Sequence, residues 1–231
     1  MKQESIFKGT ATALITPFDT DGSIDYDSLG KLIDFQISEK IDALVVCGTT
    51  GEAPSLTEEE QKEVIDFSVK KVDGRVPLIA GTGGNNVEKA VRMSKFACDS
   101  GADALLIVSP YYNKATQNGL VKTYEYIASY ANKPIIVYNV PTRTGVKTLP
   151  ETYARLSRSK NIRAVKEADS DVGLIAETFS LCGDGLDIYS GNDDRILPVL
   201  SLGGSGCISV ISNILPKKTG EIYRKFVSGV I

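Results

Sequence analysis

Apolar runs of strand length recur along the whole chain, and segments with helical patterning lie between them. The runs are rich in Val, Ile and Leu and do not alternate with polar residues, which is typical of parallel strands covered on both faces. An antiparallel sandwich would show alternating positions instead. We expect eight strands, at residues 10–18, 43–48, 77–83, 104–112, 134–141, 162–168, 186–193 and 206–212.

The segments between these runs carry signals for the start and the end of helices. Thr57 and Glu60 have the spacing of a capping box for a helix at 58–72, and Gly74 follows its end. Further helices are expected at residues 25–40, 86–100, 116–131, 149–158, 170–182, 194–202 and 216–228. Eight strands, each followed by a helix, predict an α/β protein: a (β/α)8 TIM barrel formed by residues 1–231 as a single domain.

The charge and the cysteines of the chain indicate which kind of partner it binds and in which compartment it works. The formal net charge is −3 with the two signs interspersed, so a nucleic-acid partner is not expected and a small molecule is. The apolar runs are far shorter than a membrane span, so no membrane partner is expected either. No CxxC pair and no secretory leader are present, which predicts a cytoplasmic protein with reduced thiols at Cys47, Cys98, Cys182 and Cys207.

The absence of histidine limits the chemistry further. A chain with no histidine cannot use a Ser-His-Asp or Cys-His arrangement or a His-ligated zinc ion. Proton transfer must therefore come from Tyr, Lys, Asp, Glu, Cys or water.

The active site of a TIM barrel lies at the carboxyl ends of its strands. Hydroxyl groups, small residues and a lysine are prominent at the predicted strand ends, which include Thr16, Thr49, Thr50, Tyr111, Tyr112, Tyr138, Asn139, Lys166, Glu167, Gly191 and Ile208. Because Tyr111 and Tyr112 are adjacent in a predicted strand, at most one of them can face the centre.

Lys166 is the candidate nucleophile of this rim. It ends an apolar strand, and burial lowers the pKa of a lysine, so that an uncharged amine can attack a carbonyl carbon. The alternative is a structural ion pair, with Lys166 turned outward to Glu167 or Asp169.

Two loops carry candidate groups for binding anions. GTTGE at 48–52 can offer backbone N–H groups and threonine hydroxyls to a carboxylate, although it could be an ordinary turn. In YNVPTRTG at 138–145, Pro141 and Gly145 shape a loop with Arg143 at its tip, where a guanidinium can bind a carboxylate or can simply be solvated.

Taken in order, five motifs resemble the dihydrodipicolinate synthases, a family of pyruvate-dependent class I aldolases. They are GTTGE (48–52), SPYYN (109–113), YNVPTRTG (138–145), VKEA (165–168) and SGND (190–193). The resemblance covers essentially the whole chain. It implies a lyase that condenses pyruvate with L-aspartate 4-semialdehyde, the first committed step towards diaminopimelate and lysine, with no metal and no cofactor.

The same resemblance implies roles for individual residues. Lys166 would form the Schiff base with pyruvate. Tyr138, Thr49 and Tyr112 would form a proton relay, in which Tyr112 reaches into the site of a neighbouring subunit.

Substrate contacts follow from the resemblance as well. Thr50, Gly191 and the backbone near Ile208 would surround pyruvate. Arg143 would receive the carboxylate of the aldehyde substrate.

The family is homo-oligomeric, a tetramer, and usually continues after the eighth helix into a small helical domain. We expect this sequence, which ends at Ile231, to lack most of that domain, and we expect tetramer formation to be affected. Two alternative functions stay open at this point. One is an N-acetylneuraminate or keto-sugar-acid lyase of the same family, which the Arg143 loop disfavours, and the other is a non-catalytic barrel that binds pyruvate.

Overall fold

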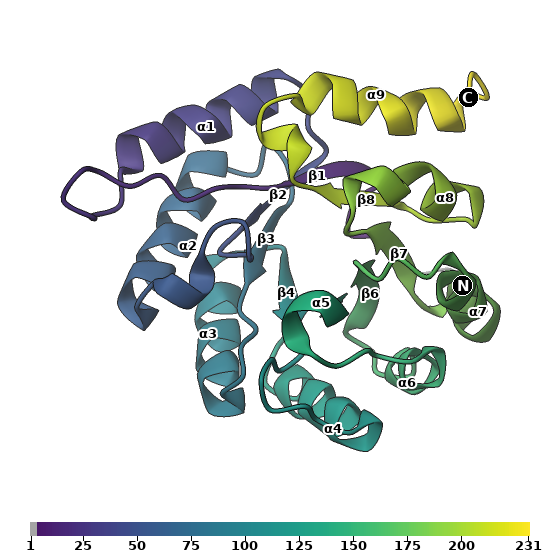
Figure 1. Cartoon of the computed structure of the whole chain (residues 1–231). Coiled ribbons are helices and arrows are strands. Elements are labelled where there is room, and N and C mark those ends of the chain that lie inside the picture. The colour runs from purple at the N-terminus through teal and green to yellow at the C-terminus, as the bar shows by residue number, and fades with distance from the viewer. Residues whose placement is uncertain (1–3) are drawn as a thin grey trace.

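Eight parallel strands close into a barrel, with helices on its outside (Figure 1). The computed structural model describes residues 4–231. Strand β1 pairs with both β2 and β8, which closes the sheet and confirms the predicted (β/α)8 TIM barrel. The strands follow one another in sequence order: β1 (Gly9–Ala13), β2 (Ala43–Val46), β3 (Leu78–Gly81), β4 (Ala104–Val108), β5 (Ile135–Asn139), β6 (Ile162–Glu167), β7 (Asp187–Ser190) and β8 (Gly206–Ser209).

All eight predicted helices are present. They are α1 (Tyr26–Ser38), α2 (Glu58–Val72), α3 (Val87–Ser100), α4 (Gln117–Ala128), α6 (Pro150–Leu156), α7 (Val172–Cys182), α8 (Ile196–Ser201) and α9 (Pro216–Val227). In α2 the predicted capping box is confirmed, because the side chains of Thr57 and Glu60 each accept a hydrogen bond from the other's backbone N–H. Short 3-10 turns lie at Ala53–Ser55, Gly183–Gly185, Asp193–Arg195 and Ile211–Asn213.

Two strands are shorter than their apolar runs indicate. Strand β1 ends at Ala13, and the chain beyond it is held by the hydroxyl of Thr16, which donates to the carbonyl oxygen of Gly51 at 2.7 Å. Strand β4 ends at Val108, and Tyr112 has a φ of 69°, which a strand cannot contain. The expected strand ends at residues 18 and 112 were therefore wrong, because the runs continue apolar into the loops of the barrel mouth.

The loop after β5 contains a one-turn helix, α5 (Pro141–Thr144), that the sequence did not predict. Pro141 begins it at a position where no amide donor is needed, and Gly145 ends it with a φ of 71°. The same two residues were expected to shape a loop with Arg143 at its tip. Arg143 thus lies on a helical turn and not at the tip of an extended loop.

The barrel interior is filled at its amino-terminal end and holds polar groups at the other. Phe7 stacks on Tyr189 with ring centres 4.2 Å apart, and the Tyr189 hydroxyl donates to the carbonyl oxygen of Phe7 at 2.7 Å. Above them lie small and branched interior residues, among them Ala11, Ala43, Ala104, Ile136, Ala164 and Ile208. A second, larger apolar layer lies between the sheet and the helices. The carboxyl end of the barrel is therefore the end at which chemistry can take place.

None of the helices within residues 4–231 combines the length and the apolar character that a membrane span requires. All four cysteines have free thiols, and Cys47, Cys98 and Cys207 are buried while Cys182 is half-buried.

Candidate active site

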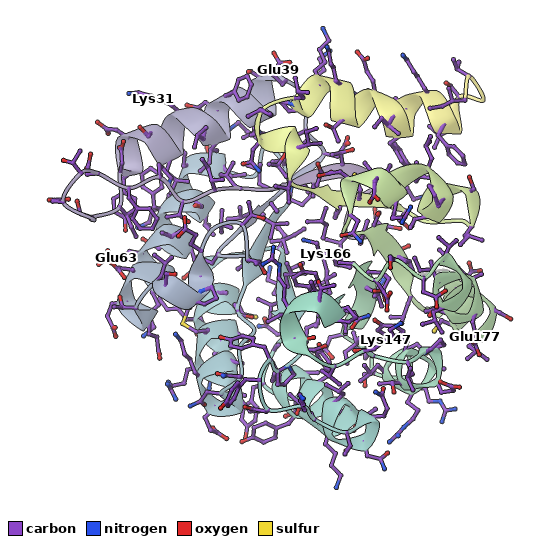
Figure 2. All side chains as sticks on the ribbon, viewed as in Figure 1. Lys31, Glu39, Glu63, Lys147, Lys166 and Glu177 are labelled. Carbon is purple, nitrogen blue, oxygen red and sulfur yellow. The ribbon has the colours of Figure 1, made fainter. Side chains whose placement is uncertain are left out.

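The side chain of Lys166 lies inside the barrel, near its centre in the view of Figure 2. It projects from β6 and is only 4% exposed. Its neighbour on β5, in direct register, is Tyr138, and the Lys166 Nζ lies 4.4 Å from the centre of the Tyr138 ring. The strand therefore brings an amine to the carboxyl end of the barrel and places it against an aromatic face.

Burial lowers the pKa of Lys166 from its ordinary value of 10.5 to about 8, and the negative charge of Asp193 opposes this effect. At pH 7 about one amine in ten is then uncharged. The alternative of an ion pair with Glu167 or Asp169 is wrong. The Glu167 carboxylate is bound by Asn139 and Tyr153, and Asp169 pairs with Lys147 at 2.7 Å.

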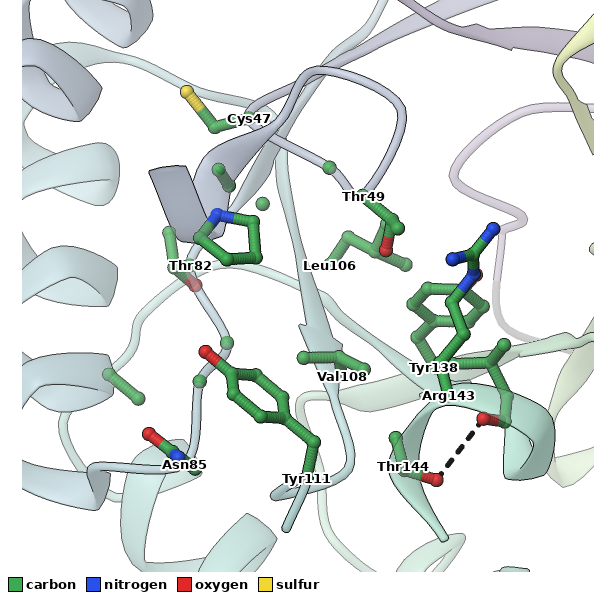
Figure 3. A pocket seen from close by; sticks show the side chains of 18 of the residues that line it. Cys47, Thr49, Thr82, Asn85, Leu106, Val108, Tyr111, Tyr138, Arg143 and Thr144 are labelled. Carbon is green, nitrogen blue, oxygen red and sulfur yellow. Dashed lines mark hydrogen bonds between the residues drawn. The ribbon is translucent and has the colours of Figure 1, made fainter. Parts of the chain in front are cut away.

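Tyr138 is buried beside two of the other predicted site residues. Burial raises the pKa of its hydroxyl, while a side-chain hydrogen bond with Thr49 and the positive charge of Arg143 both lower it. Figure 3 shows Thr49, Tyr138 and Arg143 together at one end of a cavity. A phenol next to a threonine hydroxyl and a guanidinium can donate and accept protons near a bound anion.

The cavity has a volume of about 440 Å³ and opens over β2 to β5. Leu106 and Val108 lie between the Tyr138 end and a second end at Tyr111 and Asn85 (Figure 3). It is large enough for two small organic acids. Its lining also includes Gly48, Pro54, Gln61, Thr82, Lys89 and Thr144.

The turn that carries Thr49 is fixed by close backbone contacts. Cys47 and Glu52, at its two sides, have φ angles of 52° and 55°. A Cβ at Gly81 of the next strand would collide with the carbonyl oxygen of Cys47. Only a glycine at position 81 lets the GTTGE turn fold back against β3.

Three predicted pyruvate contacts lie apart from the lining of this cavity, as far as residues 4–231 are concerned: Thr50, Gly191 and Ile208. Ile208 is fully buried inside the barrel on β8. Gly191 donates its backbone N–H to the carbonyl oxygen of Glu167 at 2.7 Å, and a Cβ there would come within 2.9 Å of the Cβ of Ala168. These two residues belong to the β6 to β8 side of the barrel, where Lys166 also lies.

Tyr112 is not brought to this site. Its side chain is 88% exposed, and its positive φ of 69° is unusual for a bulky residue. Tyr111, the preceding residue, lines the cavity instead.

Asn139, Glu167 and Asp193 were not predicted as site residues. Asn139 directly follows Tyr138, and Glu167 directly follows Lys166. Because side chains alternate along a strand, this spacing was the one signal in the sequence that both residues face outward from the barrel. Asp193 belongs to the SGND motif, and its Oδ2 accepts hydrogen bonds from the backbone N–H groups of Val210 and Ile211 at 3.2 and 3.0 Å. Its effect on Lys166 depends on the folding of β6 to β8, which no local pattern reveals.

The site can therefore form an imine with a keto acid, transfer protons through a phenol and bind carboxylates with a guanidinium. Within the described part of the chain, no group of three or more Cys, Asp and Glu side chains is placed to hold a metal ion.

Comparisons with known proteins agree with this chemistry. The model of the dihydrodipicolinate synthetase family matches residues 6–231. The chain is 52% identical over 226 residues to a 4-hydroxy-tetrahydrodipicolinate synthase of Caldicellulosiruptor saccharolyticus, covering 98% of this chain and 76% of the relative.

Solved structures of the same family are also similar. A dihydrodipicolinate synthase from Aquifex aeolicus has 43% identity and a TM-score of 0.94, covering 96% of this chain and 76% of that one. A dihydrodipicolinate synthase from Acinetobacter baumannii, in complex with pyruvate, has 40% identity and a TM-score of 0.93, with the same two coverages of 96% and 76%. The chain thus spans about three quarters of the length of these relatives.

Proposed function

Because the chain belongs to the dihydrodipicolinate synthetase family, we propose that it is a 4-hydroxy-tetrahydrodipicolinate synthase acting through a Schiff base on Lys166. It condenses pyruvate with L-aspartate 4-semialdehyde, in the synthesis of diaminopimelate and lysine. The observation that supports the role of Lys166 most strongly is its amine, buried inside the barrel and lying 4.4 Å from the centre of the Tyr138 ring.

The reaction begins with attack of the uncharged Lys166 amine on the carbonyl carbon of pyruvate. Loss of water gives an iminium ion, whose positive charge makes the pyruvate methyl group acidic. Removal of a methyl proton gives an enamine, and its carbon attacks the aldehyde carbon of the second substrate. The nitrogen of that substrate then displaces Lys166 from the imine carbon, which closes the ring and releases the free amine.

Tyr138 and Thr49 are the groups proposed to move protons in these steps. The Tyr138 ring lies against the amine, and its hydroxyl bonds to Thr49, so a proton can pass from the reacting carbon centre through the two hydroxyls.

Arg143 lines this end of the cavity, and the Lys166 amine lies outside the lining, against the Tyr138 ring; the two positive charges suit two anionic substrates. Arg143 is placed on the short helix α5 beside Tyr138, where it can bind the carboxylate of the aldehyde substrate. Thr50, Gly191 and the backbone at Ile208 are proposed to surround pyruvate on the other side of Lys166.

Tyr112 is proposed to act in a second copy of the chain. A ring that is 88% exposed, on a residue with a φ of 69°, is held away from its own barrel. In a homo-oligomer, the Tyr112 ring of one subunit could enter the site of a neighbouring subunit. There it would complete the proton relay with Tyr138 and Thr49. We propose a cytoplasmic location, in keeping with the biosynthetic reaction proposed for the enzyme.

Borohydride trapping tests this function. Incubation with pyruvate and sodium borohydride should add a reduced three-carbon acid to the peptide that contains Lys166, as read by mass spectrometry, and Lys166→Ala should abolish it. An adduct on another lysine would overturn the assignment of the nucleophile. Turnover of pyruvate with aspartate semialdehyde separates the synthase from a pyruvate-binding barrel, and cleavage of N-acetylneuraminate in its place would identify the lyase.

A further inference from the structure

The strand pair that carries Tyr138 and Lys166 has a second, outward-facing pair immediately beyond them. In the register of β5 and β6, Tyr138 lies opposite Lys166 and Asn139 lies opposite Glu167. Because successive side chains of a strand point to opposite faces, Asn139 and Glu167 leave the barrel interior and enter the layer between sheet and helices. There the Asn139 Nδ2 donates to the Glu167 Oε1 at 2.8 Å.

The Glu167 carboxylate is bound on both oxygens. The backbone N–H of Asp169 donates to Oε1 at 2.8 Å, and the hydroxyl of Tyr153 on α6 donates to Oε2 at 2.9 Å. The Asn139 Oδ1 in turn accepts from the backbone N–H of Thr148 at 3.1 Å. Four segments are thus joined at this point: β5, β6, the loop before α6, and α6 itself.

The backbone on either side of Glu167 is fixed as well. The N–H of Ala168 donates to the carbonyl oxygen of Asn139 at 2.9 Å, and the N–H of Gly191 donates to that of Glu167 at 2.7 Å. The end of β6 is therefore tied to both neighbouring strands within two residues of Lys166.

Burying the Glu167 carboxylate costs free energy, so this pair stabilises the fold poorly. Glu167 is 7% exposed, and burial raises the pKa of its carboxyl to about 7. Well-packed apolar residues at buried polar positions often give equal or greater stability. A buried carboxylate with three donors, one residue from the proposed nucleophile, is better explained by the geometry that it imposes.

We propose that Asn139 and Glu167 are positioning residues for the Schiff-base chemistry, which hold the ends of β5 and β6 in the register that keeps the Lys166 amine against Tyr138. This inference rests on the proposed function. Neither side chain reaches the cavity, so both act through the residues that precede them. A displacement of about 1 Å at a reacting group can slow a reaction about 100-fold.

A reciprocal exchange of the two side chains tests the pair. Asn139→Asp places a second carboxyl group 2.8 Å from that of Glu167, and at pH 9, which favours ionisation of both, we expect it to slow borohydride trapping of pyruvate about tenfold or more. In Glu167→Gln the side-chain oxygen can still accept hydrogen bonds from Asn139 and Asp169, and the amide group can donate to the Tyr153 hydroxyl. We therefore expect a trapping rate within about threefold of wild type. The double variant Asn139→Asp/Glu167→Gln again sets an amide donor against a carboxylate, but it leaves the Asp169 N–H without its acceptor, so it should recover part of the loss.

Stability must be separated from rate in this comparison. Trapping is measured at saturating pyruvate, at a temperature well below the unfolding midpoint of every variant, so that only folded protein reacts. Asp42→Asn is the matched control, because the Asp42 Oδ2 accepts from the backbone N–H of Thr10 at 2.8 Å at the opposite end of the barrel. We expect it to leave the trapping rate unchanged, whatever its effect on the unfolding midpoint.

Several outcomes would overturn the inference. A wild-type trapping rate in folded Asn139→Asp, or no recovery in the double variant, contradicts it. Where Asn139→Asp does not fold, Tyr153→Phe removes the one donor to Oε2 and should slow trapping about threefold, and an unchanged rate contradicts the inference. Absence of any adduct in the wild type would overturn the proposed function too, so the two failures are distinguishable.

Discussion

The Lys166 Nζ lies 4.4 Å from the centre of the Tyr138 ring, and the two residues face each other in register on neighbouring strands. The aromatic face stabilises an ammonium group, whereas burial inside the barrel destabilises it. Burial is the larger effect and, opposed by the charge of Asp193, brings the pKa of the amine to about 8. The dependence of activity and of stability on pH therefore follows from the burial of this amine.

The rate of adduct formation should rise with pH. Because only the uncharged amine attacks pyruvate, we expect the initial rate of borohydride trapping to increase from pH 6 and to level off above an apparent pKa of about 8. Asp193→Asn removes a negative charge that raises the pKa of Lys166, so the midpoint should move to lower pH. The control is Asp194→Asn, at the neighbouring residue, whose side chain is exposed, and it should leave the midpoint unchanged. A pH profile that Asp193→Asn does not alter would contradict the electrostatic role of Asp193.

Replacement of Lys166 by methionine should abolish the adduct and stabilise the fold. A pKa lowered from 10.5 to about 8 corresponds to a penalty on the order of 3 kcal/mol below pH 8. Between pH 8 and 10.5 the unfolded chain binds more protons than the folded chain, so the penalty disappears as pH rises. Urea unfolding should therefore show Lys166→Met to be more stable than wild type at pH 7, by a margin that shrinks towards pH 10.

The control for this measurement is Lys70→Met, at a lysine whose side chain is 73% exposed. Its surface ion pair with Asp66 should contribute little, so its free energy of unfolding should stay close to that of wild type at both pH values. Equal stability of Lys166→Met and wild type at pH 7 would mean that the buried amine carries no such penalty.

Removal of the Arg143 guanidinium should weaken the use of the aldehyde substrate and spare the pyruvate adduct. A charge-assisted pair of hydrogen bonds contributes about 1.5–3 kcal/mol, so the KM for aspartate semialdehyde should rise about 10-fold to 100-fold in Arg143→Ala. Trapping is best compared at pH 9, since loss of the Arg143 charge also raises the pKa of Lys166. The exposed Arg158→Ala is the control. Loss of the adduct itself in Arg143→Ala would assign Arg143 to pyruvate.

The order of strands and helices was predictable because each apolar run in this fold is buried on both faces. Ile135, Ile136 and Val137 on β5 are all fully buried, so their run is uninterrupted in the sequence. The same rule placed strand ends too late at residues 18 and 112, where apolar residues belong to the loops of the mouth. The one-turn helix α5 was missed because its four residues, Pro141–Thr144, are too few for any periodicity.

The candidate site was predictable to the extent that strand ends in a barrel meet at one rim. That rule brings Thr49, Tyr138 and Lys166 together without knowledge of any contact. It could not show that the ring of Tyr112 is exposed, because its direction depends on the φ of one loop residue. Nor could it pair Asn139 with Glu167, since that pairing depends on the register between β5 and β6.

The hydroxyl of Tyr138 should be needed for proton transfer and not for packing. Tyr138→Phe keeps the ring against which the Lys166 amine lies and removes only the group that bonds to Thr49. We expect the condensation rate to fall about 100-fold or more, as for loss of a general acid or base, with little change in the free energy of unfolding. Exchange of the pyruvate methyl protons in D2O, followed by NMR without the aldehyde, reports the proton transfer alone and should be lost together with turnover.

Variants of Thr49 test the proton relay without changing the Tyr138 ring. Thr49→Ser keeps a hydroxyl and should retain methyl exchange within about threefold of wild type, whereas Thr49→Val keeps the shape, removes the hydroxyl and should slow exchange about tenfold or more. Because the hydrogen bond from Thr49 lowers the pKa of Tyr138, Thr49→Val should also move the alkaline limb of the exchange profile to higher pH. Equal exchange rates in the serine and valine variants would remove Thr49 from the relay and leave Tyr138 in direct contact with water.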